Sequence, residues 1–259
     1  MNKWTRYALG TILLGGVLLI AYLAVRPGAA TPGEDAVVTP SATTAGDDEY
    51  TAARVRLVES GVVGMGIWDE AVIDAMLDVP RHRFVPAEFQ NQAYANHPLP
   101  IGYGQTISQP YIVALMTEAA QVGPGDVVLE IGAGSGYQAA VLAELVDHVY
   151  TIEIIGALAE QAADTLAQLG YTNVTVRHAD GYFGWEEHAP FDAIVVTAAP
   201  DHIPQPLVAQ LAIGGHMIIP VGPVGGFQTL WRVTRISETE VATENLGGVR
   251  FVPFTREEK

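Results

Sequence analysis

Three glycines at alternate positions, and a glutamate about 20 residues after the first of them, could together bind a ribose-containing ligand. Gly132, Gly134 and Gly136 follow the apolar run Val127–Ile131 and precede a helical pattern. A strand, a glycine turn and the first turn of a helix let backbone N–H groups approach a ligand closely. The next apolar run ends at Glu153, where a carboxylate can accept hydrogen bonds from ribose hydroxyls. We therefore expect these four residues to form one binding site.

The spacing of the glycines separates two classes of cofactor. A nicotinamide-binding turn has the pattern G-x-G-x-x-G, and its third glycine would fall at position 137, which is Tyr. The pattern here is E-x-G-x-G-x-G, which begins at Glu130. It resembles the first motif of class I S-adenosylmethionine-dependent methyltransferases. Because that ligand has no pyrophosphate, the glycines would allow close backbone approach to its methionine part.

A second candidate group lies in the polar, glycine-containing stretch from Pro98 to Tyr111. It stands directly before an amphipathic helix, predicted at Pro110–Ala120, and proline suits the first turn of a helix. Ser108 or Gln109 occupies the position of the helix cap. Spacing alone favours a capping role for Ser108 over a catalytic role.

The remaining pattern predicts an α/β fold that would position both groups. Helices are expected at 52–63 and 70–77, with Asp69 as the N-cap of the second helix. Helices alternate with strands first and strands cluster last, so we expect a mostly parallel sheet with antiparallel additions. The further strands are expected at 148–152, 174–178, 191–197, 212–221, 229–237 and 240–251.

Composition and charge exclude several functions. The net charge is −16 and no basic stripe is present, which argues against binding to nucleic acid. Cysteine is absent, and none of the seven histidines has metal-ligand spacing, so we assign no metal site. The basic cluster Arg81, His82 and Arg83 stands between two prolines, and a solvated surface is its expected role.

The first 50 residues form two segments of their own. Residues 7–25 carry no charge and would span about 28 Å as a helix, close to the thickness of a bilayer core. We expect a retained anchor at 1–26, although a signal peptide cleaved after residues 28–30 is an alternative. Lys3 and Arg6 predict that the N-terminus stays in the cytoplasm and that the rest crosses the membrane. Residues 27–50 are acidic and aperiodic, which predicts a disordered linker before a domain at 51–259.

Over about residues 54–254 the chain resembles the protein-L-isoaspartate O-methyltransferase family. The resemblance rests on several runs that occur in the order of the family. These runs are Gly66-Ile67-x-Asp69, Val79-Pro80-Arg81, Phe84-Val85-Pro86, Pro98-Leu99-Pro100-Ile101-Gly102, Gly104-Gln105-Thr106-Ile107-Ser108-Gln109-Pro110-Tyr111, Val128-Leu129-Glu130-Ile131-Gly132-x-Gly134-x-Gly136-Tyr137, Asp180-Gly181, Gly184-Trp185, Ala189-Pro190-Phe191-Asp192, Val221-Gly222 and Val249-Arg250-Phe251-Val252-Pro253.

The resemblance implies a Rossmann-like class I methyltransferase fold with a seven-stranded sheet. It also implies that a methyl group passes from S-adenosylmethionine to the free α-carboxylate of L-isoaspartyl residues in damaged peptides and proteins. The ester closes to a succinimide, and hydrolysis returns part of it to normal aspartate. The implied partner is damaged protein in general, and we expect the catalytic domain to be a monomer.

The resemblance also implies roles for individual residues. Ser108 would hold the acceptor carboxylate, in a groove shaped by Thr106, Ile107, Gln109, Pro110 and Tyr111. Asp180 would accept a hydrogen bond from the adenine amine, although Ala179 replaces the first glycine of the usual Gly-Asp-Gly. The other implied cofactor residues are Glu130, Gly132, Gly134, Gly136, Glu153, Gly181 and Thr197.

Two rival functions and one question of location stay open. A related methyltransferase with another acceptor is disfavoured by the intact stretch from Gln105 to Tyr111. A non-catalytic binding module is disfavoured because Ser108 and the glycines are all present. The charge balance predicts an extracytoplasmic catalytic domain, yet S-adenosylmethionine is made inside the cell. An exported, cleaved form and a domain that faces the cytoplasm are the alternatives.

Overall fold

The computed structural model describes residues 45–256. The expected membrane anchor and most of the expected linker lie outside the described residues. Among the helices of the described part, none is both long enough and apolar enough to cross a membrane.

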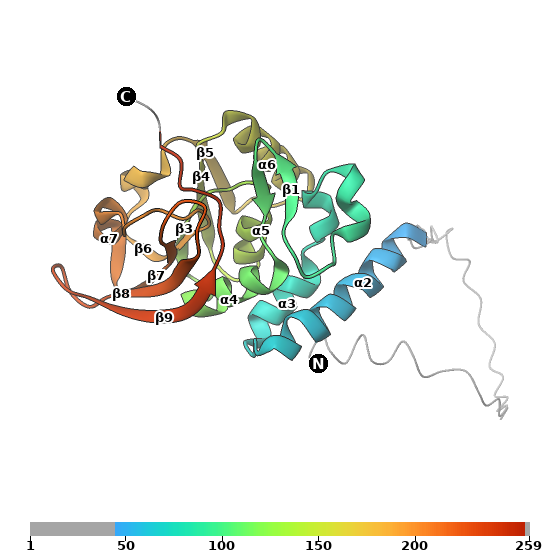
Figure 1. The fold of residues 1–259 in the computed structure, drawn as a ribbon, viewed down its shortest axis with the longest axis horizontal. Helices are drawn as coiled ribbons and strands as arrows, with labels where there is room; N and C mark the ends of the chain where they lie inside the picture. Colours follow the sequence, from blue (N-terminus) through green and yellow to red (C-terminus); the bar gives the residue numbers. More distant parts are fainter. Residues whose placement is uncertain (1–44, 257–259) are drawn as a thin grey trace, which may run out of the picture. The chain divides into compact units, whose positions relative to one another are not determined.

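A seven-stranded sheet forms the centre of the globular part, in the order β5-β4-β3-β6-β7-β8-β9 (Figure 1). The pairs from β5 to β7 are parallel, and β8 and β9 are antiparallel additions. This confirms the predicted mostly parallel sheet with antiparallel strands at its end. The strands are β3 Val127–Ile131, β4 His148–Glu153, β5 Val174–His178, β6 Phe191–Val196, β7 Leu211–Val221, β8 Gln228–Arg235 and β9 Val241–Val249.

Strand order places a ligand site near the middle of this sheet. From β3 the chain first adds β4 and β5 on one side, and then returns to add β6 and β7 on the other side. The strand order therefore reverses at β3. In open α/β sheets a crevice forms at this switch point, beyond the carboxyl ends of the strands. The glycine motif follows β3 directly, and Glu153 is the last residue of β4. Topology alone therefore brings the first predicted group together.

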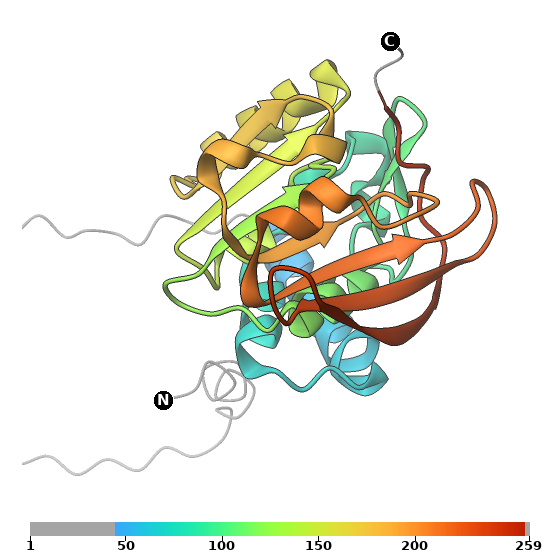
Figure 2. The same cartoon turned by 90° about the vertical axis from the view of Figure 1, so that its left-hand side faces the viewer.

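Helices lie on both faces of the sheet (Figures 1 and 2). One face carries α4, α5 and α6, with α3 packed on α4 and α5, while α7 contacts β7 from the other face. The helices are α2 Ala45–Gly61, α3 Glu70–Asp78, α4 Pro110–Ala120, α5 Tyr137–Ala143, α6 Gly156–Gln168 and α7 Gln205–Gln210. Short 3-10 helices are η2 Val63–Met65, η3 Arg81–Phe84, η4 Ala87–Gln92, η5 Gly181–Phe183 and η6 Glu186–His188.

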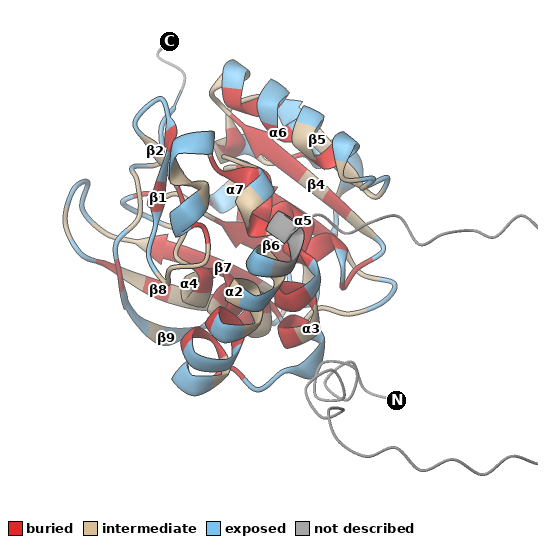
Figure 3. Cartoon of the chain, turned by 90° about the vertical axis from the view of Figure 1, so that its right-hand side faces the viewer, coloured by how far each residue is buried: buried red, intermediate tan, exposed pale blue. Residues whose placement is uncertain are grey.

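The central strands are buried on both faces, as Figure 3 shows by their colour. In β6 every residue except Asp192 is buried, and in β3 every residue after Val127 is buried. A parallel strand covered by helices on both sides reads as a continuous apolar run, because neither face meets water. The one charged residue within these two buried runs is Glu130, so it requires a chemical explanation.

Two local elements differ from the sequence prediction. Helix α2 begins at Ala45 instead of residue 52, so its first residues belong to the segment expected as linker. Tyr50, also in that segment, stacks on the ring of His82 with centroids 4.1 Å apart, which explains its place in the globular part. The stretch before Ser108 forms an antiparallel hairpin of β1 Leu99–Gly102 and β2 Gln105–Ile107. By contrast, Asp69 is confirmed as an N-cap, since it accepts from the backbone of Ala71 and Val72.

Candidate active site

The glycine loop after β3 packs directly against the end of β6. Gly132 has a φ of +98°, in the region that residues with a side chain rarely adopt. A Cβ at this position would lie 2.4 Å from Oγ1 of Thr197. The Thr197 hydroxyl lies 2.7 Å from the carbonyl oxygen of Gly132 and 3.0 Å from that of Ile131, and can donate to either. The Thr197 hydroxyl therefore holds the loop by hydrogen bonding, and only glycine at position 132 leaves room for the Thr197 side chain.

Glu153 connects the end of β4 to the same loop. One carboxylate oxygen accepts a hydrogen bond from the N–H of Gly134 at 2.8 Å, and the other accepts from the N–H of Ile155 at 2.9 Å. The residue is only 5% exposed. Each carboxylate oxygen has two lone pairs, so each retains a free acceptor position. Glu153 can thus shape the loop and still accept hydrogen bonds from a ribose.

Glu130 brings a buried carboxyl group to the floor of the site. Its Oε2 accepts a hydrogen bond from Thr151 at 2.5 Å, whereas its Oε1 is buried without a partner among the described residues. Burial raises the pKa of Glu130 to about 8. A buried polar atom without a partner is rare in folded proteins and is a feature of ligand sites. Glu130 therefore fits a ligand that brings a donor or a positive charge.

Ser108 approaches from the hairpin side. It follows β2 and precedes Gln109, which is the N-cap residue of α4 and makes no side-chain cap hydrogen bond. The expected capping role of Ser108 is not found, because its hydroxyl makes no hydrogen bond to the first turn of α4. Within residues 45–256, Arg81 donates a hydrogen bond to the main-chain carbonyl of Ser108 and none is made by its hydroxyl, so the hydroxyl is available to a ligand.

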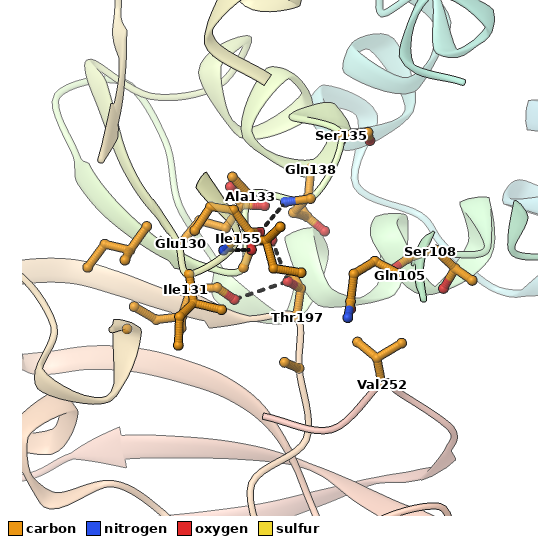
Figure 4. Close-up of a pocket in the computed structure, with 18 of the residues that line it drawn as sticks. Gln105, Ser108, Glu130, Ile131, Ala133, Ser135, Gln138, Ile155, Thr197 and Val252 are labelled. Atoms are coloured by element: carbon orange, nitrogen blue, oxygen red, sulfur yellow. Dashed lines mark hydrogen bonds between the residues drawn. The ribbon is translucent and has the colours of Figure 1, made fainter. Parts of the chain in front are cut away.

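These groups line one pocket that is open to solvent. Figure 4 shows Gln105 and Ser108 on one side of it and Glu130, Ala133 and Thr197 on the other. The structure thus unites the two groups that the sequence placed more than twenty residues apart. The predicted residues that line the pocket are Thr106, Ile107, Ser108, Glu130, Gly132, Gly134, Glu153, Gly181 and Thr197.

Five predicted residues do not line this pocket. Gly136 packs beneath the loop, where an added Cβ would lie 3.2 Å from Leu166. Asp180 stands at the end of β5 beside the pocket residue Gly181. The other three are Gln109, Pro110 and Tyr111, which lie at the start of α4.

The carboxylate of Asp180 already has partners within the chain. It accepts from the N–H of Tyr182 at 3.0 Å and from Nε of Arg256 at 2.8 Å. The Arg256 guanidinium also lies over the ring of Tyr182, 3.7 Å from its centroid. Asp180 therefore joins the C-terminal segment to the edge of the site.

That C-terminal segment is the part of the site that residue-level reasoning missed. Val252, Pro253, Phe254 and Thr255 line the pocket, although nothing in their spacing indicates a site. Pairing with Ala199 after β6 places them, since Ala199 donates to the carbonyl of Val252 at 2.9 Å and accepts from Phe254 at 3.0 Å. The one available signal was that Val252 and Pro253 belong to the family-like run that ends at Pro253. The remaining pocket residues not predicted as site residues are Gln105, Val113, Ile131, Ala133, Ser135, Tyr137, Gln138, Ile152, Ile154, Ile155 and Ala198.

The basic cluster after Pro80 is a correction to the sequence analysis. Arg83 is exposed as expected, but Arg81 is 0% exposed, so a solvated surface was the wrong interpretation for it. The reason is the turn of η3, which directs Arg81 into the protein beside Phe84 while Arg83 faces solvent. Charge alone could not distinguish the two residues.

The sheet topology and the pocket at its switch point, together with the family match, make the chain a class I S-adenosylmethionine-dependent methyltransferase. The model of the protein-L-isoaspartate(D-aspartate) O-methyltransferase family matches residues 56–259, and the chain belongs to this family. Its activity is therefore that of a protein-L-isoaspartate O-methyltransferase, which uses S-adenosylmethionine to begin the repair of isoaspartyl residues.

Relatives and solved structures agree with this assignment. The chain is 56% identical over 207 residues to the protein-L-isoaspartate O-methyltransferase of Picosynechococcus sp., covering 80% of this chain and 92% of the relative. It is 55% identical over 201 residues to that of Gloeobacter violaceus, covering 78% and 98%.

Two solved structures share the fold. One is a protein-L-isoaspartate O-methyltransferase with 28% identity and a TM-score of 0.71, over 77% of this chain and 65% of that one. The other is a putative member of the family from Plasmodium falciparum in complex with S-adenosyl-L-homocysteine. It has 26% identity and a TM-score of 0.68, over 79% of this chain and 99% of that one.

Proposed function

We propose that Ser108 holds the free α-carboxylate of an L-isoaspartyl residue while the ends of β3 and β4 hold S-adenosylmethionine. One observation carries this division. Ser108, whose hydroxyl has no partner among the described residues, lines the same pocket as Glu130, whose buried Oε1 has none there either. One wall can thus take an anionic acceptor, and the other can take a cationic donor.

Little acid–base chemistry is required of this site. When bound, S-adenosylmethionine supplies a methyl group on a positively charged sulfur. A carboxylic acid titrates near pH 4, so the acceptor is already ionised at neutral pH and needs no general base. The Ser108 hydroxyl donates to one carboxylate oxygen and leaves the other oxygen free to attack. Catalysis then comes from orientation and from exclusion of water.

The cofactor wall combines backbone and carboxylate groups. Glu153 accepts from the ribose, and Glu130 faces the methionine end, where a positive charge stabilises its ionised form. Gly132 and Gly134 permit close approach, and Asp180 with Gly181 borders the adenine. The apolar side chains of Val252, Pro253 and Phe254 close the pocket from the C-terminal side.

The acceptor wall is the hairpin and the start of α4. Thr106 and Ile107 line the pocket directly and form an edge along which an extended peptide can lie. Gln109, Pro110 and Tyr111 shape the groove from the first turn of α4. The free edge of a short strand suits a flexible peptide, because main-chain hydrogen bonds do not depend on its sequence.

Two variants of the full-length chain separate the two walls. Ser108→Ala should lower kcat for an isoaspartyl peptide by about 100-fold while the Kd for S-adenosylmethionine stays within about two-fold. Glu153→Ala should instead raise that Kd by about 10-fold or more, because it removes charged hydrogen bonds to the ribose. Ser60→Ala is the matched control, since Ser60 bonds only to its own helix at the carbonyl of Arg56. Loss of cofactor binding in Ser108→Ala would contradict the acceptor role.

For location, we propose a membrane anchor at 1–26, a linker at 27–50 and a monomeric catalytic domain on the extracytoplasmic side. The apolar run at 7–25 and the charges of Lys3 and Arg6 support this topology. Protease added to intact spheroplasts should digest the domain, whereas protection until lysis would mean that it faces the cytoplasm. An N-terminus that begins near residue 30 would indicate a cleaved signal peptide instead. Light scattering of the detergent-solubilised chain gives its molar mass, and the mass of a single chain is the expected result.

A further inference from the structure

Arg81 is a fully buried cation close to the acceptor wall, and no role in the reaction has yet explained it. It begins η3 and is 0% exposed. Removing a guanidinium from water is costly unless hydrogen bonds replace the lost hydration. Burial lowers the pKa of Arg81 to about 10, so the side chain still carries its charge at neutral pH. A protein that needed only packing here could use an apolar residue, so the contacts of Arg81 deserve an explanation.

Those contacts join three separate segments. Nε donates a hydrogen bond to the carbonyl of Ala93 at 2.9 Å, just after η4. Nη2 donates to the carbonyl of Ser108 at 2.7 Å. The guanidinium also lies over the ring of Tyr137, 4.8 Å from its centroid. Tyr137 is the first residue of α5, directly after the glycine motif, and both Ser108 and Tyr137 line the pocket.

We propose that Arg81 is a positioning residue for methyl transfer, which fixes the main chain of Ser108 relative to the helix that follows the cofactor loop. This proposal rests on the acceptor role of Ser108 stated above. Ser108 lies between the short strand β2 and helix α4, and its side chain does not cap α4. Neither element therefore fixes the position of its hydroxyl. The guanidinium of Arg81 donates to the Ser108 carbonyl and at the same time packs on the ring of Tyr137. These two contacts together supply that restraint.

The guanidinium is suited to this task in a way that other side chains are not. Its planar fork donates in two fixed directions and also stacks on an aromatic ring. A lysine keeps the charge, but its three N–H donors share one nitrogen on a flexible stem, so it lacks the rigid, separated donors that match both carbonyls and the face that stacks on Tyr137. Methionine has similar length but no donor, and would leave the carbonyls of Ala93 and Ser108 without this partner. The series Arg, Lys and Met therefore removes the restraint in steps.

The test uses Arg81→Lys and Arg81→Met in the full-length chain, each also combined with Ser108→Ala. Rates for an isoaspartyl peptide are expressed per cofactor-binding site, so that misfolded molecules do not count. Arg81→Lys should lower kcat by about 10-fold and Arg81→Met by about 100-fold, with the Kd for S-adenosylmethionine within about three-fold. In the Ser108→Ala background, where the hydroxyl is already absent, Arg81→Lys should lower kcat by less than about three-fold. Arg83→Lys is the matched control on η3, since Arg83 is exposed.

The outcomes distinguish this proposal from the proposed function. An unchanged kcat per site in Arg81→Lys, with only a lower Tm, would mean a purely structural role and would overturn the proposal. The same loss with and without the Ser108 hydroxyl would also overturn it, because Arg81 would then act independently of Ser108. If Ser108→Ala is inactive while Arg81→Lys is fully active, the proposed function stands and the proposal alone fails. A fully active Ser108→Ala would refute the role of Ser108 itself, and with it the proposal.

Discussion

At the scale of single residues, the unusual features of this site are a buried acid and a glycine that no other residue could replace without a clash. Glu130 lies in the interior strand β3, and its Oε1 has no hydrogen-bond partner among the described residues, while Gly132 adopts a φ of +98° against Thr197. The buried, unpartnered oxygen of Glu130 costs stability in the absence of a ligand, whereas Gly132 adopts its positive φ without strain because it has no Cβ. Such local costs are typical of functional positions.

The raised pKa of Glu130 predicts how stability depends on pH. Folding raises this pKa from 4.5 to about 8, so the folded state holds the proton more tightly than the unfolded state. The contribution to stability is therefore complete below about pH 4.5 and is lost as pH rises through 8. Glu130→Gln cannot titrate at this position. The Tm of the variant minus the Tm of the wild type should therefore be about 5 °C more positive at pH 8 than at pH 5. Thermal unfolding of both proteins measures this, and a Tm difference that does not change with pH would be inconsistent with a buried, titrating Glu130.

Gly132→Ala should weaken cofactor binding, and a second glycine provides its control. Gly125 has a nearly equal φ of +96° but nothing within 4 Å of an added Cβ, and it precedes β3 at the end remote from the loop. Gly125→Ala should cost about 1 kcal/mol of stability from backbone strain alone, with cofactor affinity within about two-fold. Gly132→Ala adds the clash with Thr197 and should lower affinity by at least about 10-fold. Calorimetric titration with S-adenosyl-L-homocysteine measures the affinity of each variant. Equal affinities of Gly132→Ala and Gly125→Ala would contradict the expected effect of the clash.

At the scale of elements, the C-terminal segment completes the pocket and is fastened by Arg256. Arg256→Met removes the hydrogen bond and ion pair with Asp180 and the cation–π contact with Tyr182. We expect the Kd for S-adenosylmethionine to rise by about three- to 10-fold, because the segment from Val252 to Thr255 loses its attachment. Arg250→Met is the control, since Arg250 makes a similar contact with Phe227, which does not line the pocket. Tighter binding in Arg256→Met would show that Arg256 competes with adenine for Asp180.

The elements also show what the sequence can and cannot predict. Pro110–Ala120 and Val127–Ile131 were predicted to the residue, because a proline marks the start of the helix and an apolar run marks a strand buried on both faces. The hairpin around Tyr103 was not predicted, since β1 and β2 have only four and three residues and no clear alternation. Arg81 was misjudged because burial of a cation depends on the carbonyls of Ala93 and Ser108, which come from later segments. Periodicity reports local structure, whereas these contacts depend on the tertiary fold.

At the scale of the whole molecule, strand order explains how distant parts of the chain make one active site. The chain crosses the sheet in opposite directions from β3, which opens the crevice that the glycine loop, Glu153 and Thr197 surround. The hairpin before α4 and the segment after β9 then close this crevice from two sides.

The most direct test of the central claim compares two peptides that differ only in one linkage. The full-length chain is incubated with S-adenosylmethionine labelled in its methyl group and with either an isoaspartyl peptide or its aspartyl counterpart. We predict a base-labile methyl ester on the isoaspartyl peptide alone, and its loss in Ser108→Ala. Equal labelling of both peptides, or no labelling of either while the cofactor remains bound, would contradict the proposed acceptor site.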